Sequence, residues 1–307
     1  MSNPPDIRYV KHEDIDPSKW DHCLEEAENG LIYGYSDYLD RMAIHWDGLV
    51  YGDYQAVMPL TWNKKFNISY LYQPAFTASL GVFGNGLTDH LVEIFISRIP
   101  KKFRLIEIAL NHGNIFNSLP SYAMPRANYI LSLNRSYEEL STGYRENIRR
   151  NIRKAIQAHC VCKKDIAVRE IIDLSKAIMQ KRTRIKETDY SRFEKLFGQF
   201  HREKKAVTYG IYSPAGNLLS SAVYFLLKKR AYYILVGNSP DGKTIGASHY
   251  LIDSFIRDYA GQDLTLDFEG SDIRNLAFFY GSFGAKQEPY PFVKINRLPF
   301  GLRWLKK

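Results

Sequence analysis

The order of strands and helices that the sequence predicts in its first half returns in its second half, about 160 residues later. Each copy begins with a Tyr-Gly strand, a turn and an Ala-Val strand, in GLVYGDYQAVMPL (residues 48–60) and VTYGIYSPAGNLLSSAVYFL (residues 207–226). Each continues with a strand, an amphipathic helix and a further strand. A repeat of this length predicts two similar domains rather than a solenoid. Hairpin strands followed by a strand–helix–strand unit predict an α/β (α+β) fold, in which each domain has a mixed twisted sheet flanked by helices.

The length of 307 residues also favours two domains, because a single hydrophobic core rarely grows beyond about 250–300 residues. We expect the first domain at residues 1–134 and the second at residues 135–307, which begins with a basic helical connector. The first domain is predicted to be a degenerate copy. Its loop before the helix, within YQPAFTASLGVFGNGLTDH, is aromatic and contains no Lys or Arg.

Composition excludes several classes of protein. Hydrophobic residues make up 45% of the sequence and aromatic residues 14%, which is enough to fill packed cores, so disorder is not expected. No apolar run approaches the roughly 18 residues that a membrane-spanning helix needs. The N-terminal residues have no signal-peptide pattern. The sequence therefore predicts a cytoplasmic protein without a membrane span.

The three cysteines, Cys23, Cys160 and Cys162, lack the paired spacing of a zinc site. Cys160 and Cys162 lie beside His159, which gives three potential ligands, but reduced thiols near the end of a helix are the more common interpretation. No metal is therefore predicted, and no motif supports catalysis by a cysteine.

Positive charge is concentrated in the middle of the chain. Residues 135–205 contain 19 Lys and Arg against 10 Asp and Glu, an excess that equals the net charge of +9 of the whole protein. Such a surface suits a phosphate-rich partner such as CoA, a nucleotide-sugar, RNA or an anionic membrane face. The alternative is a solvated helical face that serves solubility.

A predicted helix in ENIRRNIRKA opens this basic region. Helical spacing places Ile148, Ile152, Ala155 and Ile156 on one buried face. Another side carries arginines at intervals of four residues, and we interpret these as a substrate-binding or anion-binding surface: Arg145, Arg149 and Arg153.

The second domain contains a strand, a loop with glycines and a helix, in AYYILVGNSPDGKTIGASHYLIDSFIRDYA (residues 231–260). The first N–H groups of a helix have no partner within it, and the helix dipole is positive at that end, so the arrangement predicts an anion site. Gly246 would allow a phosphate to approach closely, and Lys243 would add a positive charge. The alternative is a plain strand-to-helix turn in which the glycine serves the backbone conformation.

The run Lys243-x-x-Gly246-x-Ser248 resembles the (Gln/Arg)-x-x-Gly-x-(Gly/Ala) pyrophosphate loop of Gcn5-related N-acetyltransferases (GNAT), with Lys and Ser as departures. AFFYGSFGA, residues 277–285, resembles the Tyr-x-x-x-Gly segment in which such enzymes often carry a Tyr as general acid. The resemblance implies two acyl-CoA N-acyltransferase-like (GNAT-like) domains with acyl-CoA as the co-substrate. The donor would then be bound by Lys243 and the backbone of Gly246, Ala247, Ser248 and His249, and its carbonyl by an N–H near Val236 or Gly237, where Gly237 would mark a β-bulge.

Two such domains with an Arg- and Lys-rich helix before the second resemble the Fem family of non-ribosomal peptidyltransferases. Members of that family add amino acids from aminoacyl-tRNA to cell-wall precursors. The segments that carry this resemblance are ENIRRNIRKA, LTLDFEGS and FFYGSFGA. Where Fem enzymes tend to have a Lys, this chain has Tyr280, which favours ordinary acyl-CoA chemistry. The long coiled-coil arm of some members is also missing from the sequence.

Acyl transfer to an amine needs a bound donor, a polarised carbonyl, a base and an acid. The resemblance implies that Tyr280 protonates the departing sulfur. Strand alternation in LTLDFEG places Asp267 and Glu269 on one face, and these two carboxylates are the candidate bases. The alternative for Asp267 is an ion pair with an arginine such as Arg274.

The acceptor, a small-molecule or peptide amine, would bind in a cleft between the domains near Tyr72 and Gln73. The alternative for these two residues is a place among the core side chains of a sheet. Three functions remain open: an N-acyltransferase that uses a CoA thioester, a Fem-like aminoacyltransferase that uses aminoacyl-tRNA, and a non-catalytic binder of an anionic polymer. The sequence favours the first and leaves the oligomeric state open.

Overall fold

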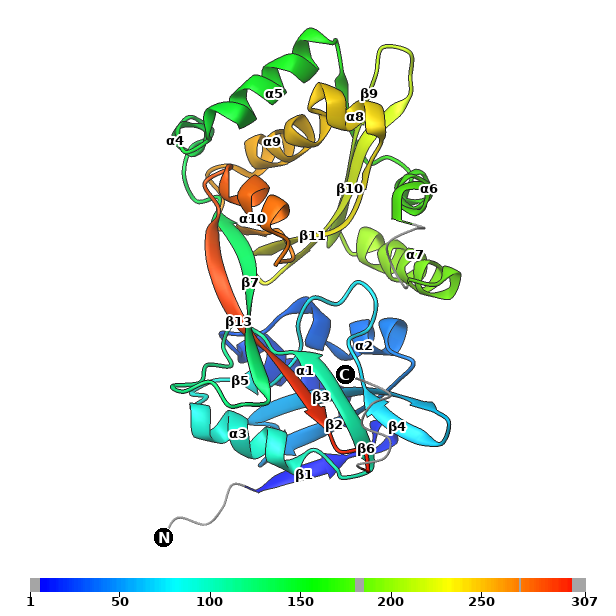
Figure 1. Cartoon of the computed structure of the whole chain (residues 1–307), viewed down its shortest axis with the longest axis vertical. Helices are drawn as coiled ribbons and strands as arrows, with labels where there is room; N and C mark the ends of the chain where they lie inside the picture. The colour runs from blue at the N-terminus through cyan, green and yellow to red at the C-terminus, as the bar shows by residue number, and fades with distance from the viewer. Residues whose placement is uncertain (1–5, 180–184, 271, 300–307) are drawn as a thin grey trace. The chain divides into compact units, whose positions relative to one another are not determined.

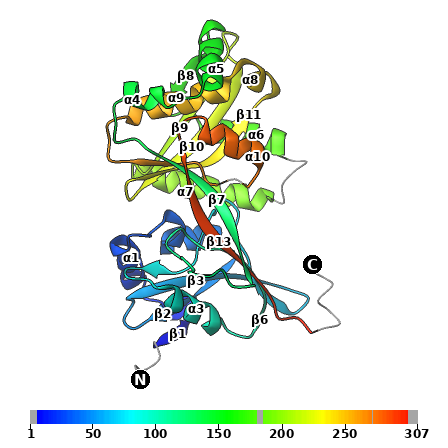
Figure 2. The ribbon, with the colours of Figure 1, turned by 60° about the vertical axis from the view of Figure 1, so that its left-hand side comes forward.

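The structure, a computed structural model, describes residues 6–179, 185–270 and 272–299. The chain divides into two compact units, unit 1 (Met1–Arg126 with Pro289–Lys307) and unit 2 (Ala127–Glu288). Each unit contains a sheet with helices packed on it, as Figures 1 and 2 show. The predicted α/β fold, with a mixed, helix-flanked sheet in each half, is confirmed.

The sheet of unit 1 has the strand order β1-β2-β3-β4-β6-β13. Neighbouring strands are antiparallel except β4 and β6, which are parallel. The strands are β1 (Ile7–Val10), β2 (His45–Tyr51), β3 (Ala56–Lys65), β4 (Ile68–Leu71), β6 (Phe103–Ala109) and β13 (Lys286–Asn296), and β5 (Phe83–Gly84) pairs with β3. The helices are α1 (Pro17–Glu26), α2 (Ser36–Met42) and α3 (Asp89–Arg98), with 3-10 turns at His12–Asp14 and Ile32–Gly34.

The sheet of unit 2 has the strand order β7-β12-β11-β10-β9-β8, and its parallel pair is β11 with β12. Helices α5 and α9 lie on one side of this sheet, and α6 and α7 lie on the other (Figure 1). The strands are β7 (Ala123–Ser132), β8 (Val161–Lys164), β9 (Ala206–Tyr212), β10 (Leu218–Leu227), β11 (Arg230–Asn238) and β12 (Thr265–Asp267). The helices are α4 (Tyr137–Thr142), α5 (Glu146–Gln157), α6 (Val168–Met179), α7 (Glu187–Arg202), α8 (Pro240–Ile245), α9 (Ala247–Tyr259) and α10 (Arg274–Gly281).

The predicted repeat is present in the topology. Strands β2, β3, β4 and β6 of unit 1 are arranged as β9, β10, β11 and β12 of unit 2 are. In each set the last two strands are parallel and a helix, α3 or α9, lies between them in the sequence. A parallel pair needs a crossover of this kind, so the strand–helix–strand pattern in the sequence determines this part of the fold.

The strand that follows the repeat in each sheet comes from a distant part of the chain. Strand β13 pairs with β6 in unit 1, and β7 pairs with β12 in unit 2. The predicted domains, 1–134 and 135–307, follow the repeat along the chain, whereas the compact units follow contacts. The two divisions therefore differ at residues 127–134 and 289–307. Long-range strand pairing of this kind has no local sequence pattern.

Helix α5 packs on α9 through a narrow stripe. Ile148, Ile152 and Ala155 are buried, as predicted. Ile156 is 48% exposed, so its predicted place on the buried face is wrong. Successive residues of a helix are turned by about 100° around the helix axis. Ile156 therefore points in a different direction from Ala155 and lies outside the narrow stripe of buried residues.

No helix in the parts of the chain that the structure describes is long and apolar enough to cross a membrane.

Candidate functional site

Strands β11 and β12 of unit 2 separate after three residue pairs. These pairs are Arg230–Thr265, Ala231–Leu266 and Tyr232–Asp267. Strand β12 ends at Asp267, whereas β11 continues to Asn238. From Tyr233 onward, described residues pair with β11 only on its β10 side. An unpaired strand edge presents N–H and C=O groups that an extended ligand with amide groups can pair with.

A register shift distorts β11 near its middle. Val223 of β10 pairs with Leu235 and Tyr224 pairs with Tyr233, so Ile234 is an extra residue in β11. The bulge therefore lies at Ile234 and not at Gly237, where it was predicted. Gly237 pairs regularly with β10, and a Cβ there would stand 2.9 Å from Leu174 of α6, so packing explains the glycine.

The loop that was predicted to bind a pyrophosphate is largely helical, since α8 occupies residues 240–245. The N–H of Lys243 donates to the carbonyl of Ser239 at 3.0 Å, and the N–H of Gly246 donates to Gly242. The N–H of His249 donates to Gly246 at 3.0 Å. Two of the four backbone donors expected at the anion site, those of Gly246 and His249, are therefore engaged within the chain.

Helix α5 lies directly over Gly246. A Cβ on this residue would stand 2.5 Å from the carbonyl oxygen of Asn151, and φ at Gly246 is 81°. Lys154 of α5 also donates to the carbonyl of Thr244 at 2.8 Å. Gly246 thus adopts the left-handed conformation that joins α8 to α9, and its lack of a side chain lets α5 pack closely against it. This is the structural alternative that the sequence left open. Of the neighbouring positions, Ala247 is fully buried and Lys243 is exposed.

His249 is the third residue of α9 and lies among aromatic side chains. Its ring makes an edge contact with Phe279, with 4.9 Å between centroids, and lies 6.4 Å from Phe283. The Nδ1 atom is buried and has no hydrogen-bond partner among the described residues. Burial lowers the pKa of His249 to about 4, so the imidazole is neutral at pH 7.

Tyr280 of α10 is buried, with 8% of its surface exposed, and stacks on Phe268 at 4.6 Å. Burial, and then the negative charge of Glu269, raise the pKa of Tyr280 above its usual value of about 10. The structure therefore brings Tyr280 and Glu269 within electrostatic reach of each other, at the end of β12. A tyrosine that stays protonated in such a place can donate a proton to a leaving group.

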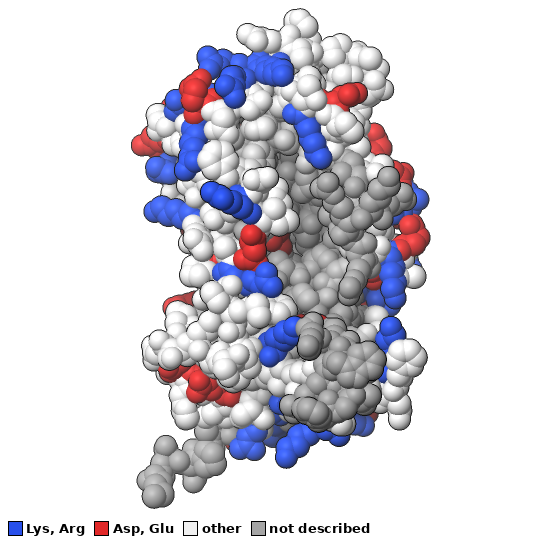
Figure 3. All heavy atoms as spheres, viewed as in Figure 1, with Lys and Arg blue, Asp and Glu red and all other residues white. Residues whose placement is uncertain are grey.

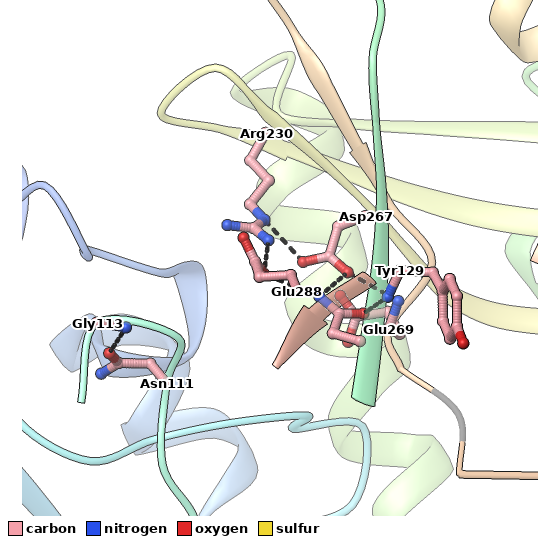
Figure 4. Close-up of polar contacts among 8 residues, drawn as sticks. Asn111, Gly113, Tyr129, Arg230, Asp267, Glu269 and Glu288 are labelled. Atoms are coloured by element: carbon pink, nitrogen blue, oxygen red, sulfur yellow. Dashed lines mark hydrogen bonds and ion pairs between the residues drawn. The ribbon is translucent and has the colours of Figure 1, made fainter. Parts of the chain in front are cut away.

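Asp267 belongs to a buried charge network, which Figure 4 shows. Its Oδ2 accepts a hydrogen bond from Nε of Arg230 at 2.7 Å, and Arg230 also pairs with Glu288. Its Oδ1 accepts from Nδ2 of Asn128 at 2.9 Å and from the N–H of Glu269 at 2.8 Å. Both carboxylate oxygens are thus engaged. The arginine pairing that the sequence left open is present, with Arg230 in place of Arg274, and Glu269 is the better candidate base.

Sequence reasoning missed the partners in this network, Asn128, Arg230 and Glu288. They are separated from one another and from Asp267 by 21 to 160 positions in the chain, so no spacing relates them. The one available signal was a set of charged residues at the ends of strands that are otherwise apolar.

The arginine row lies on the exposed side of α5, and Figure 3 shows Lys and Arg gathered where this helix lies. Arg145 lies over the ring of Phe278 at 4.9 Å. Arg149 donates to two carbonyls at the end of α4, and Arg153 pairs with Glu146 at 2.6 Å. Arg150 is exposed and forms no ion pair with any described residue.

Tyr72 and Gln73 belong to unit 1, whereas the other candidate residues belong to unit 2. The side-chain amide of Gln73 accepts from the N–H of Ala109 at 3.1 Å and donates to Thr77 at 3.0 Å. The hydroxyl of Tyr72 accepts from the N–H of Ile44 at 2.8 Å. These contacts favour the alternative of a structural role within the unit, and the acceptor cleft stays a prediction.

Within the described residues, no group of three or more His, Cys, Asp and Glu is placed to hold a metal ion. Cys23, Cys160 and Cys162 are free thiols.

Comparisons with known proteins agree with the mixed, helix-flanked sheets described above. Residues 142–274 match the model of the acetyltransferase (GNAT) domain. Three solved structures are similar: FemX (14% identity, 95% of this chain, 98% of that chain, TM-score 0.66), a conserved protein of unknown function from Bacteroides thetaiotaomicron (13%, 94%, 99%, 0.58) and L-PGS from Bacillus licheniformis (10%, 94%, 95%, 0.53). No curated protein matches the sequence. The chain therefore has the GNAT fold, and the predicted resemblance to tandem GNAT and Fem proteins is confirmed for the fold.

Proposed function

We propose that unit 2 is the active centre of an N-acyltransferase that takes its acyl group from an aminoacyl-tRNA and transfers it to an amine. The GNAT fold supports acyl transfer as the reaction class. The similarity to FemX over nearly the whole of both chains supports a donor of the Fem type. Acyl-CoA, which the sequence favoured, becomes the second candidate.

The observation that carries this choice is the contact between α5 and Gly246. A CoA pyrophosphate bound in the GNAT manner needs free N–H groups and open space at this loop. Here two of the four N–H groups expected to hold the pyrophosphate, those of Gly246 and His249, are engaged within the chain, and the backbone of Asn151 fills the space above Gly246. An aminoacyl-tRNA does not need that cradle, because its phosphates can lie on a basic surface elsewhere.

The outward face of α5 supplies such a surface. Arg150 has no ion-pair partner among the described residues, Arg145 lies over the ring of Phe278, and Arg149 is 4.0 Å from the carboxylate of Glu146. Arginine is suited to phosphate because its planar fork donates two parallel hydrogen bonds. Binding through such contacts weakens steeply as salt concentration rises.

The reaction can be written with the groups present. The acceptor nitrogen attacks the ester carbonyl of the donor, while an N–H on the free edge of β11, near Val236, polarises that carbonyl. The new C–N bond forms and the ester C–O bond breaks. Glu269 takes the proton from the nitrogen, directly or through water, and Tyr280 gives a proton to the departing ribose oxygen. Exchange with water then restores both side chains.

The raised pKa of Tyr280 suits this leaving group. A thiol has a pKa of about 8.5, so the sulfur of CoA can leave as an anion without a proton. An alkoxide is far more basic and must be protonated as it leaves. A buried tyrosine that remains protonated throughout the working pH range is therefore more useful to an ester donor than to a thioester donor.

The second candidate, an acyl-CoA-dependent N-acyltransferase, is favoured by the match of residues 142–274 to the acetyltransferase domain. Its donor would lie along β11 without the pyrophosphate contact at Gly246, so weak CoA binding would be expected.

The test compares the thermal stability of the full chain with CoA, acetyl-CoA, uncharged tRNA and aminoacyl-tRNA. A ligand that binds only the native state raises the melting temperature. We expect both tRNA forms to stabilise the protein and the CoA species to have little effect. Stabilisation by CoA alone would contradict the proposal and restore the second candidate. Binding of tRNA without amine-dependent release of its amino acid would instead indicate a non-catalytic binder.

A pair of variants tests the α5 surface. Arg150→Gln should weaken tRNA binding and reduce the slope of log affinity against log salt by about 1. Lys195→Gln on α7 removes a charge that is also exposed, from another helix, and should leave the slope unchanged. Equal effects from the two variants would show that tRNA responds only to net charge.

A further inference from the structure

The hairpin between β3 and β4 has a phenylalanine at its tip. Lys65 pairs with Ile68, so the turn consists of two residues, Phe66 and Asn67. Their φ angles are 47° and 62°, both in the left-handed region that two-residue hairpin turns of type I′ require. Asn is a usual residue in this conformation, whereas a bulky aromatic residue is not.

Packing within the chain does not explain Phe66 either. Its surface is 88% exposed, the highest value among the large exposed hydrophobic side chains of the described residues. The ammonium group of Lys65 lies 5.4 Å from its ring centroid. Neither the backbone conformation nor the core therefore gains from a phenylalanine here, which points to a surface outside the chain that receives the ring.

The surroundings of the tip are basic. Lys64 and Lys65 are exposed, and neither forms an ion pair with a described residue. Strand β4 pairs with β6, where Arg104 is also exposed, as is Lys101 in the turn before this strand. Burial, and then the nearby positive charge of Arg104, lower the pKa of Arg297 in the same part of unit 1. Figure 1 shows the hairpin beside the label β4 at the edge of unit 1.

We propose that the β3–β4 hairpin docks on an anionic lipid bilayer, with the ring of Phe66 in the interfacial layer and Lys64 and Lys65 on headgroup phosphates. Aromatic rings partition into this layer, and lysines near it are attracted by its negative surface potential. The ring at the tip and the cations behind it match the order of layers in a bilayer. A pocket on a protein partner would accept the ring, but the exposed cations at the end of β3 and at the start of β6, which form no ion pair with a described residue, favour a continuous anionic surface.

Vesicle flotation of the full chain tests the proposal, with vesicles of phosphatidylglycerol and phosphatidylcholine compared with phosphatidylcholine alone. We expect binding to the anionic vesicles and about ten-fold weaker binding to the neutral ones. Phe66→Asn should lower binding to anionic vesicles about ten-fold. Lys64→Gln and Lys65→Gln should each lower it about five-fold and reduce its sensitivity to salt. Because Asn suits the left-handed region, Phe66→Asn should keep the parental melting temperature.

Ile115→Asn is the matched control, since Ile115 is 67% exposed in a different loop of unit 1. Its removal should leave vesicle binding unchanged. The proposal is overturned if the parental chain does not bind anionic vesicles, or if Phe66→Asn binds them as the parent does. Loss of binding equal in Phe66→Asn and Ile115→Asn would overturn it as well, because general hydrophobicity would then explain the result.

Discussion

Each unit contains a pair of parallel strands that separate, and the two units differ in what lies beside the strand that continues. In unit 1, β4 and β6 part after Leu71, and the chain itself takes the vacated place: Leu80 bridges Leu110 in parallel, and Gln73 bonds the N–H of Ala109. In unit 2 the strand that ends first is β12, the counterpart of β6, and beyond Tyr232 no described residue pairs with β11 on that side. The same strand plan therefore supports a filled core in one unit and a free strand edge in the other.

The polar groups near the two separations differ in the same way. In unit 1 the buried amides of Asn29, Asn111 and Asn114 all donate to the carbonyl of Val82, and their oxygens accept backbone or side-chain donors. A buried network that is fully hydrogen-bonded is rigid and costly to open. In unit 2, Nδ1 of His249 is buried without a described partner. The asparagine cluster of unit 1 is thus hydrogen-bonded throughout, whereas the buried Nδ1 of His249 in unit 2 is not.

The largest expected effect concerns the acid in unit 2. Tyr280→Phe should lower turnover by about 10²–10³-fold, because it removes the proton for the leaving group and keeps the ring. Steady-state transfer assays measure this. Tyr212→Phe, which removes a hydroxyl bonded to Glu170 in the same unit, should keep parental turnover. If Tyr280→Phe and Tyr212→Phe both turn over at the parental rate, Tyr280 is not the acid for a substrate bound at the free edge of β11.

Gly246→Ala should lower the free energy of unfolding by about 3 kcal/mol, from a left-handed backbone and an overlap with Asn151. Denaturant unfolding measures the loss. Gly86→Ala in unit 1 is the control, since its φ is 62° and no atom lies within 4 Å of its Cβ position. It should lose only about 1 kcal/mol. Equal losses of unfolding free energy in the two variants would mean that α5 moves aside for the added methyl group. The loop at Gly246 could then open for a phosphate.

The histidine in unit 2 should make stability depend on pH. An unfolded chain binds a proton at His249 with a pKa of about 6.5, whereas the folded chain does so only at about 4. The unfolded state therefore gains protons first, and stability should fall by up to about 3 kcal/mol as pH drops from about 6.5 to about 4. His249→Phe should show a flatter profile over this range. An unchanged profile would place His249 in solvent and remove the contrast with unit 1.

The smallest effect is expected in unit 1. Gln73→Leu should lower the free energy of unfolding by about 1–2 kcal/mol, because the N–H of Ala109 loses its acceptor. Turnover should stay at the parental value. A large loss of turnover with intact stability would show that the filled separation in unit 1 also takes part in substrate binding, and the two units would then be functional equivalents.

The elements of both units could be predicted because each has a local pattern. The apolar stripe of α5 and the strands around Asp267 follow from residue periodicity, and the order of elements identified the fold. The site was harder, because contacts between distant residues determine it. Nothing near Gly246 indicates that Asn151 will cover it, and nothing near Asp267 indicates Asn128. Lys243 was predicted in a loop, but the helical hydrogen bonds of α8 engage the same backbone groups.

The pairing of β13 with β6 has a consequence for the order of events on the ribosome. Unit 2 is one continuous stretch, Ala127–Glu288, and all of it is synthesised before the paired part of β13, Phe292–Asn296. Strand β6 ends at Ala109, so its outer edge waits for nearly 190 residues of further synthesis. At about 5–20 residues per second this is a delay of about 10–40 s. The C-terminal half can therefore be complete first, and a nascent chain that stalls before Phe292 leaves the N-terminal sheet with an open edge.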